Sequence, residues 1–304
     1  MIRVSTNLIY VSVFIFTIAG CFRPAPEPPP SSAPQQDRRQ SPSNPPQTKP
    51  GEKYYQYDDT GRLVSEGYIK NGQLYQVRYA YDYHGNLESR AEYVNNKLDG
   101  IYQGFKPSGS LYVEQTFRDG KLNGSKREYS TEGTLLMEKN YKDGKLHGMT
   151  REYANGELIA EKNYLNDQLN GLSKEYFPNG NVYMIKTYKD NVLHGLTWEY
   201  DQKGNLVFEH LYKNGELVSH KESYPSGSLM RETILERGVE VWIREYYESG
   251  ALMREKIFEN GRPVEINEFY ENGAIMYKRV FKEGILIRQE QYDLQGNLLN
   301  VQTH

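Results

Sequence analysis

The sequence predicts an all-β fold, in which β-hairpin repeats over residues 52–304 form one elongated, twisted antiparallel meander of about 22 strands. Three observations predict it. A Gly-x-apolar element recurs at intervals of 23 or 24 residues. A second turn residue follows each element after roughly half of that interval. The segments between turns are about eight to ten residues long, which is typical of strands.

The composition agrees with strands that are only half buried. Of the 304 residues, 25% are charged and 37% are hydrophobic, and the mean hydropathy is −0.80. The 27 Tyr and 27 Gly distinguish the chain from a disordered one. Many aromatic residues with few Ile and Val favour half-buried strands. The net charge of −3 provides no basic surface, so we expect no nucleic-acid partner.

Residues 1–20 are predicted to be a lipoprotein signal peptide. Arg3 gives a short positive start, and Leu8–Ala19 form an apolar run that is short for a membrane span. The following Ile18-Ala19-Gly20-Cys21 resembles a bacterial lipobox, which implies cleavage before Cys21 and acylation of its sulfur, as with palmitate. Cys21 is the one cysteine, so no internal disulfide can form. The alternatives are an ordinary signal peptide or an uncleaved anchor.

Residues 21–51 are predicted to be the lipidated Cys followed by a disordered linker. This segment holds ten of the fourteen prolines and has no hydrophobic period. We expect a tether, partly polyproline II, that holds the following domain away from the membrane. Several acyl chains anchor a protein firmly, and Phe22 in place of Asp favours the outer membrane over the inner one. The expected location is therefore the bacterial cell envelope.

The turn positions of residues 52–304 form two interleaved sets, which define about 10–11 repeats of 23–24 residues. The first set is Gly61, Gly85, Gly109, Gly133, Gly156, Gly180, Gly204, Gly227, Gly250, Gly273 and Gly296. The second set is Gly72, Asn96, Gly120, Gly144, Asp167, Asn191, Gly215, Gly238, Gly261 and Gly284. Gly, Asn and Asp tolerate a left-handed backbone, so we expect positive φ at these positions.

The residues between the turns alternate as strand residues do. Leu135, Met137, Lys139 and Tyr141 are predicted to share one face and to stack with their counterparts in other repeats. The return strands carry a basic-Glu-aromatic element, such as Arg127-Glu128-Tyr129. At roughly 4.8 Å per strand, the array would be on the order of 100 Å long.

A Leu-x-Gly element after the second turn predicts a β-bulge in the earlier repeats. Its glycines are Gly100, Gly124, Gly148, Gly171 and Gly195. After residue 200 the element is lost, and the spacing to the following Glu shortens by one residue. We therefore expect bulges that are absent from the last four repeats, with a change of curvature near residue 200.

Residues 132–148, EGTLLMEKNYKDGKLHG, resemble the MORN-repeat variant of YwqK-type antitoxin-component proteins. The resemblance covers roughly residues 53–300 and implies hairpin repeats that contact proteins and sometimes lipids. It brings no catalytic residues. The segments Tyr55–Leu63 and Tyr79–Leu87 also resemble the YD repeat of Rhs-type proteins, which implies a related hairpin chemistry.

Three groups of residues are candidate sites. His147 and His194 occupy equivalent slots four strands apart, about 19 Å, so they cannot share a metal ion. A Glu column predicts cross-strand charge pairing rather than a catalytic carboxylate pair: Glu128, Glu152, Glu175, Glu199, Glu222, Glu245 and Glu268. The tyrosines have three readings, which are structural packing, a glycan-binding surface and protein recognition.

These observations predict a membrane-anchored envelope lipoprotein that serves as a non-catalytic scaffold for a protein partner. No catalytic motif is present, and we expect no enzyme, cofactor or metal. Two alternatives stay open. One is an antitoxin or immunity protein that neutralises a toxin, and the other is a module that binds glycan or peptidoglycan.

Overall fold

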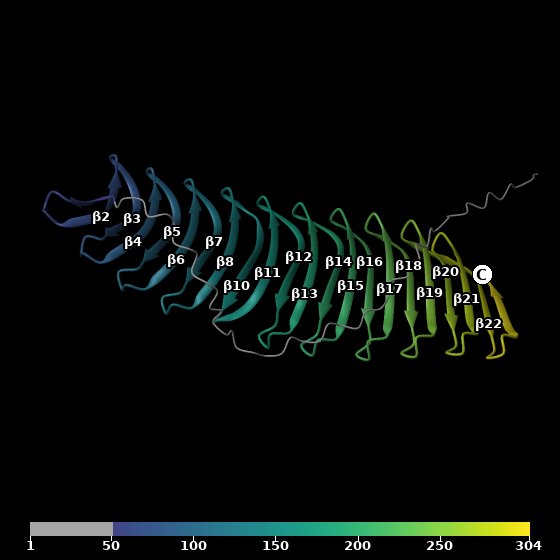
Figure 1. Cartoon of the computed structure of the whole chain (residues 1–304). Helices are drawn as coiled ribbons and strands as arrows, with labels where there is room; N and C mark the ends of the chain where they lie inside the picture. Colours follow the sequence, from purple (N-terminus) through teal and green to yellow (C-terminus); the bar gives the residue numbers. More distant parts are fainter. Residues whose placement is uncertain (1–50) are drawn as a thin grey trace, which may run out of the picture. The chain divides into compact units, whose positions relative to one another are not determined.

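The computed structural model describes residues 51–304, and these form one open antiparallel sheet without helices (Figure 1). The predicted signal peptide, Cys21 and the linker up to residue 50 lie outside the described residues. Within 51–304 there is no helix with the length and apolar character needed to cross a membrane.

The sheet consists of short strands that follow one another in chain order. They are β1 (Glu52–Tyr57), β2 (Leu63–Lys70), β3 (Gln73–Tyr81), β4 (Leu87–Val94), β5 (Lys97–Phe105), β6 (Leu111–Arg118), β7 (Lys121–Tyr129), β8 (Leu135–Lys142), β9 (Lys145–Leu146), β10 (Gly148–Ala154), β11 (Glu157–Leu165), β12 (Gln168–Tyr176), β13 (Val182–Lys189), β14 (Val192–Tyr200), β15 (Leu206–Lys213), β16 (Glu216–Ser223), β17 (Leu229–Glu236), β18 (Val239–Tyr246), β19 (Leu252–Glu259), β20 (Arg262–Phe269), β21 (Ile275–Lys282), β22 (Ile285–Tyr292) and β23 (Leu298–Thr303).

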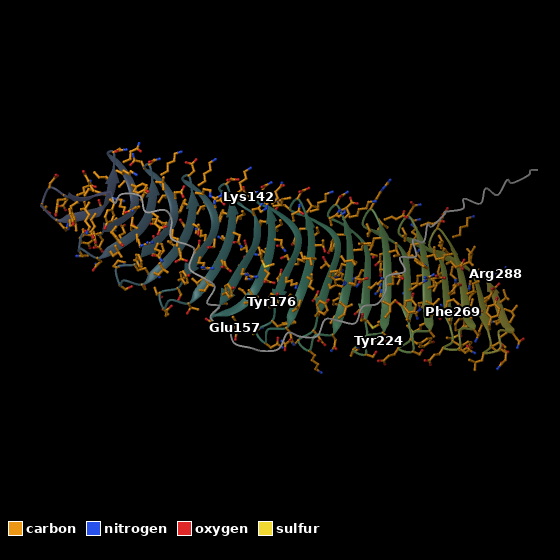
Figure 2. The ribbon with its side chains drawn as sticks, in the orientation of Figure 1. Lys142, Glu157, Tyr176, Tyr224, Phe269 and Arg288 are labelled. Carbon is orange, nitrogen blue, oxygen red and sulfur yellow. The ribbon has the colours of Figure 1, made fainter. Side chains whose placement is uncertain are left out.

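Apart from the short β9 and the two end strands β1 and β23, each strand pairs with two neighbours along the meander, so the predicted all-β meander is confirmed. β9 and β10 both pair with β8 and lie on one line that is interrupted at His147. The 23 segments therefore occupy 22 strand positions. Figure 2 shows the two sets of turns at opposite edges of the sheet, with Lys142 at one edge and Glu157 and Tyr224 at the other.

Cross-strand pairing sorts the side chains into rows that run across the strands. Because successive side chains point to opposite faces, the rows also define two faces. The "lysine face" carries the lysine row, which is Lys126, Lys139, Thr150, Lys162, Ser173, Lys186, Thr197, His210, His220, Thr233, Ile243 and Lys256. Beside it runs the glutamate row, which includes the Glu column. The opposite "arginine face" carries the arginine row, which is Glu114, Arg127, Glu138, Arg151, Glu161, Lys174, Ile185, Trp198, Glu209, Lys221 and Glu232.

Few residues are fully buried, because no second layer covers either face among residues 51–304. The buried apolar side chains are Ala80, Ala91, Val113, Ala160 and Ile243. The buried polar ones are Ser65, Thr150, Ser173, Thr197, Thr233 and Asn267. Most of these are small side chains on the lysine face, where longer neighbours on adjacent strands cover them. Stability therefore depends on the backbone ladder and on cross-strand pairs rather than on a deep core.

The turns adopt the left-handed backbone that their residue types favour. All positions of both turn sets have positive φ, from 65° at Asn96 to 89° at Gly204. The residue before the second turn position is also left-handed, as at Asn71 with φ 49° and Asp119 with φ 49°. Two successive left-handed residues make the type I′ turns that suit twisted hairpins.

The five bulge glycines lie where strand pairing is interrupted. Between β6 and β7, Gln115 pairs with Lys126 and Phe117 pairs with Leu122, so one residue faces three. The same arrangement occurs between β4 and β5, β11 and β12, and β13 and β14. It also occurs between β2 and β3, where Gln76 with φ 71° stands in place of glycine.

The expectation that the last four repeats lack a bulge is wrong. Between β15 and β16, Leu211 pairs with Ser219 and Tyr212 pairs with Leu217, which leaves one extra residue. The three following hairpins repeat this shift. The bulge is therefore one residue shorter after residue 200 rather than absent. The Leu-x-Gly element is lost there because the smaller insertion needs no glycine. The change of curvature near residue 200 stays a prediction.

The expectation that Leu135 shares a face with Met137 is also wrong. Glu128 pairs with Met137, but its neighbour Tyr129 pairs with Leu135, so the register shifts between them. This shift places Leu135 on the arginine face with Tyr129, whereas Met137 stays on the lysine face. The apolar residues Leu135 and Met137 therefore lie on opposite faces of the sheet and do not form one continuous apolar stripe.

Candidate binding surface

Ion pairs link neighbouring strands on the lysine face. Lys162 lies 2.6 Å from Glu152, and Lys186 lies 2.7 Å from Glu175. Near the C-terminal end of the sheet, Arg254 contacts both Glu245 at 2.9 Å and Glu268 at 3.0 Å. Four residues of the Glu column, Glu152, Glu175, Glu245 and Glu268, thus form cross-strand ion pairs, as predicted. Glu128 instead pairs with Lys126 of its own strand at 2.8 Å.

The arginine face carries a bridged series of charges. Arg127 contacts Glu114 at 3.4 Å and Glu138 at 2.9 Å. Arg151 contacts the same Glu138 at 3.3 Å and Glu161 at 3.0 Å. Glu138 and Glu161 are 17% and 16% exposed, so these carboxylates depend on their partners more than a free surface charge does.

Tyrosine hydroxyls extend these networks. Tyr176 donates to Glu161 at 2.8 Å, and Tyr81 donates to Glu66 at 2.9 Å. Burial, and then the hydrogen bond to Glu161, raise the pKa of Tyr176 far above its ordinary value. In the last repeats, Tyr224 in a first turn donates to the backbone oxygen of Tyr246 at 2.7 Å, which joins consecutive turns. These tyrosines have a structural role.

A row of exposed apolar side chains borders the glutamate row on the lysine face. Tyr112 and Leu136 are each 40% exposed, and Ile159 is 39% exposed. They occupy equivalent bulge positions in β6, β8 and β11. We call Tyr112, Leu136 and Ile159 the apolar row. Apolar side chains bordered by charged ones are typical of protein-binding surfaces.

The lysine face is hollowed beside the apolar row. A depression of about 490 Å³ is lined by Tyr102, Lys106, Tyr112, Val113, Gln115, Lys126, Glu128, Tyr129 and Leu136. Gly104 takes the place that the Glu column occupies in later repeats. A side chain there would meet the Tyr112 ring at 2.8 Å, so the glycine lets this ring lie against the sheet.

In the slot that His147 and His194 share, most side chains contact the next repeat, whereas the buried Nδ1 of His147 has no hydrogen-bond partner among the described residues. Asn123 and Asn170, in the same slot, donate to Asp143 at 3.2 Å and Asp190 at 3.1 Å in the next second turn. His194 Nδ1 likewise accepts from the Asn214 backbone N–H at 3.3 Å. The slot therefore holds polar side chains that connect successive turns.

Sequence reasoning missed a pair of histidines that the register brings together. His210 on β15 and His220 on β16 are direct cross-strand partners, and their Nδ1 atoms are 3.1 Å apart. They replace the Lys and the small residue that the lysine row carries in preceding strands, such as Lys186 and Thr197. The interrupted Lys column in the sequence was the signal that could have revealed them.

A second missed signal is the residue that faces each bulge. In the early repeats it is polar, and Asn140 and Asn163 donate to the backbone oxygens of Met149 at 2.7 Å and Leu172 at 3.0 Å. In the last four repeats it is aliphatic: Leu211, Ile234, Ile257 and Val280. Polar side chains thus satisfy the backbone that the longer bulge frees, and the shorter bulge does not require them.

Comparison with known proteins identifies one segment. Residues 169–190, which span most of β12 and all of β13, match the family described as MORN repeat variant. No curated protein matches the chain. The resemblance of Tyr55–Leu63 and Tyr79–Leu87 to the YD repeat stays an expectation.

Solved structures show only remote similarity. The chain is 14% identical in sequence to one protein chain in each of two solved structures, which are described as "Crystal Structure of TcdB2-TccC3-Cdc42" and "Crystal Structure of TcdB2-TccC3 without hypervariable C-terminal region". The similarity covers 83% and 84% of this chain, with TM-scores of 0.20 and 0.19. The chain spans 17% of the length of each, and similarity this low supports no argument. The chain is therefore a long array of antiparallel β-hairpin repeats with a MORN repeat variant over a short segment.

Proposed function

We propose that the protein is a membrane-anchored repeat lipoprotein of the bacterial envelope and a non-catalytic binding scaffold for a protein partner. The observation that carries this proposal is the lysine face, where the apolar row and the hollow beside it lie open next to charged rows. Apolar and aromatic side chains with a polar surround suit a protein partner better than a small substrate. The anchor supplied by Cys21 would confine this surface to the membrane.

The anchor is tested by replacing Cys21 in the full chain. Cys21→Ala should move the protein from the membrane fraction to the soluble envelope fraction, because the acceptor for the acyl chains is gone. Labelling with a palmitate analogue should give signal for the natural chain and none for the variant. Equal membrane recovery of both chains, without label in either, would contradict the proposed anchoring.

The binding surface is tested by photo-crosslinking in cells. A crosslinking amino acid at Tyr112 or Leu136 should yield one discrete protein adduct. The matched control is Leu172, which is 44% exposed but lies on the arginine face. Adducts at the lysine face alone support the proposal, and mass spectrometry of the adduct distinguishes an envelope protein from a toxin. Equal labelling at all three positions, or labelling at none, would argue against a specific surface here.

A further inference from the structure

The His210–His220 pair is the place where the lysine row departs most clearly from its repeat. Both residues point to the lysine face, at the centre of the four strands β14–β17. Thr197 precedes them in the row and Thr233 follows, and both threonines are buried. The hydroxyl of Thr197 has no hydrogen-bond partner among the described residues. A repetitive surface thus contains one site with distinct chemistry.

The spacing of the two imidazoles suits a shared metal ion. Nitrogen ligands lie about 2.0–2.1 Å from Zn²⁺ and related cations, in tetrahedral or square-planar geometry. Two such nitrogens are then about 2.9–3.4 Å apart, by simple trigonometry on those bond lengths and angles. The observed Nδ1–Nδ1 distance is 3.1 Å. The two Nδ1 atoms share a hydrogen bond at this distance, and a bound cation would replace its proton.

The surroundings keep the imidazoles uncharged and therefore able to coordinate. Burial lowers the pKa of His210, and the nearby Glu199 carboxylate only partly opposes it. Burial also lowers the pKa of His220, and the charges of His210 and Arg231 add to this effect against Glu222. The neutral imidazoles provide lone pairs at neutral pH, and the two carboxylates favour an added positive charge.

We propose that His210 and His220 bind one divalent transition-metal cation, of the Cu²⁺, Ni²⁺ and Zn²⁺ class, through their Nδ1 atoms. Residues 51–304 contain no group of three or more His, Cys, Asp or Glu residues placed to hold a metal. Solvent therefore completes the coordination, and the ion exchanges readily. Cu²⁺ binds more tightly than Ni²⁺, because imidazole sites follow the usual order of divalent affinities. Binding would join β15 to β16 at this point of the sheet.

The test is calorimetric titration of the full-length protein in detergent with CuCl₂ and with NiCl₂ at pH 7.5. One binding site is expected, and His210→Gln or His220→Gln should each weaken it by about tenfold or more. Copper bound to the natural chain should show two nitrogen couplings in its electron paramagnetic resonance spectrum. Binding should fall as the pH drops below 6.5 and through the lowered pKa values of the two imidazoles, because protons then compete with the cation.

Two further variants keep the test independent of folding. The double variant H210K/H220T restores the Lys and Thr that the row carries at Lys186 and Thr197, so it should fold but not bind. His194→Gln should bind as the natural chain does, because that ring lies in the slot that contacts the second turn. Absence of binding by the natural chain, or unchanged binding by the folded double variant, would overturn the proposal.

Discussion

Gly124→Ala should lower the free energy of unfolding by about 1–3 kcal/mol, because it forces an alanine into a backbone conformation that only glycine adopts readily. The φ of Gly124 is 120°. An added Cβ would also meet the Cβ of Thr116 at 3.0 Å and its Cγ2 at 3.2 Å. The bulge cannot relax simply, since Gly124 is also paired with Tyr141 on the other side. Urea unfolding followed by circular dichroism measures the loss.

A matched control separates this effect from loss of any glycine. Gly120→Asn, in the adjacent second turn, should change stability by no more than about 0.5 kcal/mol. Asn96 and Asn191 already occupy the equivalent position with φ of 65° and 68°. No atom lies within 4 Å of the Cβ that the control would add. If both variants lost the same stability, the special conformation of the bulge would not be the cause.

Arg151→Leu should lower stability by about 1–2 kcal/mol at pH 7, which is more than an exposed ion pair contributes. Arg151 bridges Glu138 and Glu161, and its removal leaves both half-buried carboxylates with fewer partners. The arginine itself is 39% exposed, so solvent screens part of the effect and the loss stays below that of a fully buried pair. Thermal and urea unfolding measure the difference from the natural chain.

The effect of Arg151→Leu should depend on pH. Burial alone would raise the pKa of Glu161, but hydrogen bonds from Tyr176 and Arg151 outweigh it and lower that pKa below its ordinary value of 4.5. A carboxyl with a lowered pKa in the folded state contributes stability above its ordinary pKa and loses it as the pH falls through the lowered value. The difference between variant and natural chain should therefore shrink from pH 7 to pH 3.

The control for the arginine row is an exposed pair at the edge of the sheet. Lys97 and Asp119 are 2.6 Å apart, but their side chains are 59% and 71% exposed. Lys97→Met should therefore cost no more than about 0.5 kcal/mol and should respond strongly to salt. A loss as large as that of Arg151→Leu would show that burial does not decide the strength of these pairs.

Much of the fold followed from local chemistry. A turn that needs a left-handed residue restricts the choice to a few residue types, so its recurrence is visible in one sequence. Gly124 and Gly148 predicted bulges in the same way, through a residue type that the local backbone requires. Gln76 did not, because it occupies the bulge position without the residue type that marks it. The shorter bulge after residue 200 also has no glycine, so the loss of the Leu-x-Gly element wrongly predicts that these repeats lack a bulge.

The candidate sites depended on contacts that the sequence does not display. His210 and His220 are ten residues apart and became partners only through the register of β15 and β16. Leu136 became part of the apolar row because it is the extra residue of a bulge, which reverses the expected alternation.

The sequence by itself determined the number, length and direction of the strands, since turn residues act over a few neighbouring bonds. Only the tertiary structure decided which side chains share a face and which stand opposite each other. The physical reason is that a slip of one residue between strands moves a side chain to the other side of the sheet, and backbone pairing across the hairpin sets that slip.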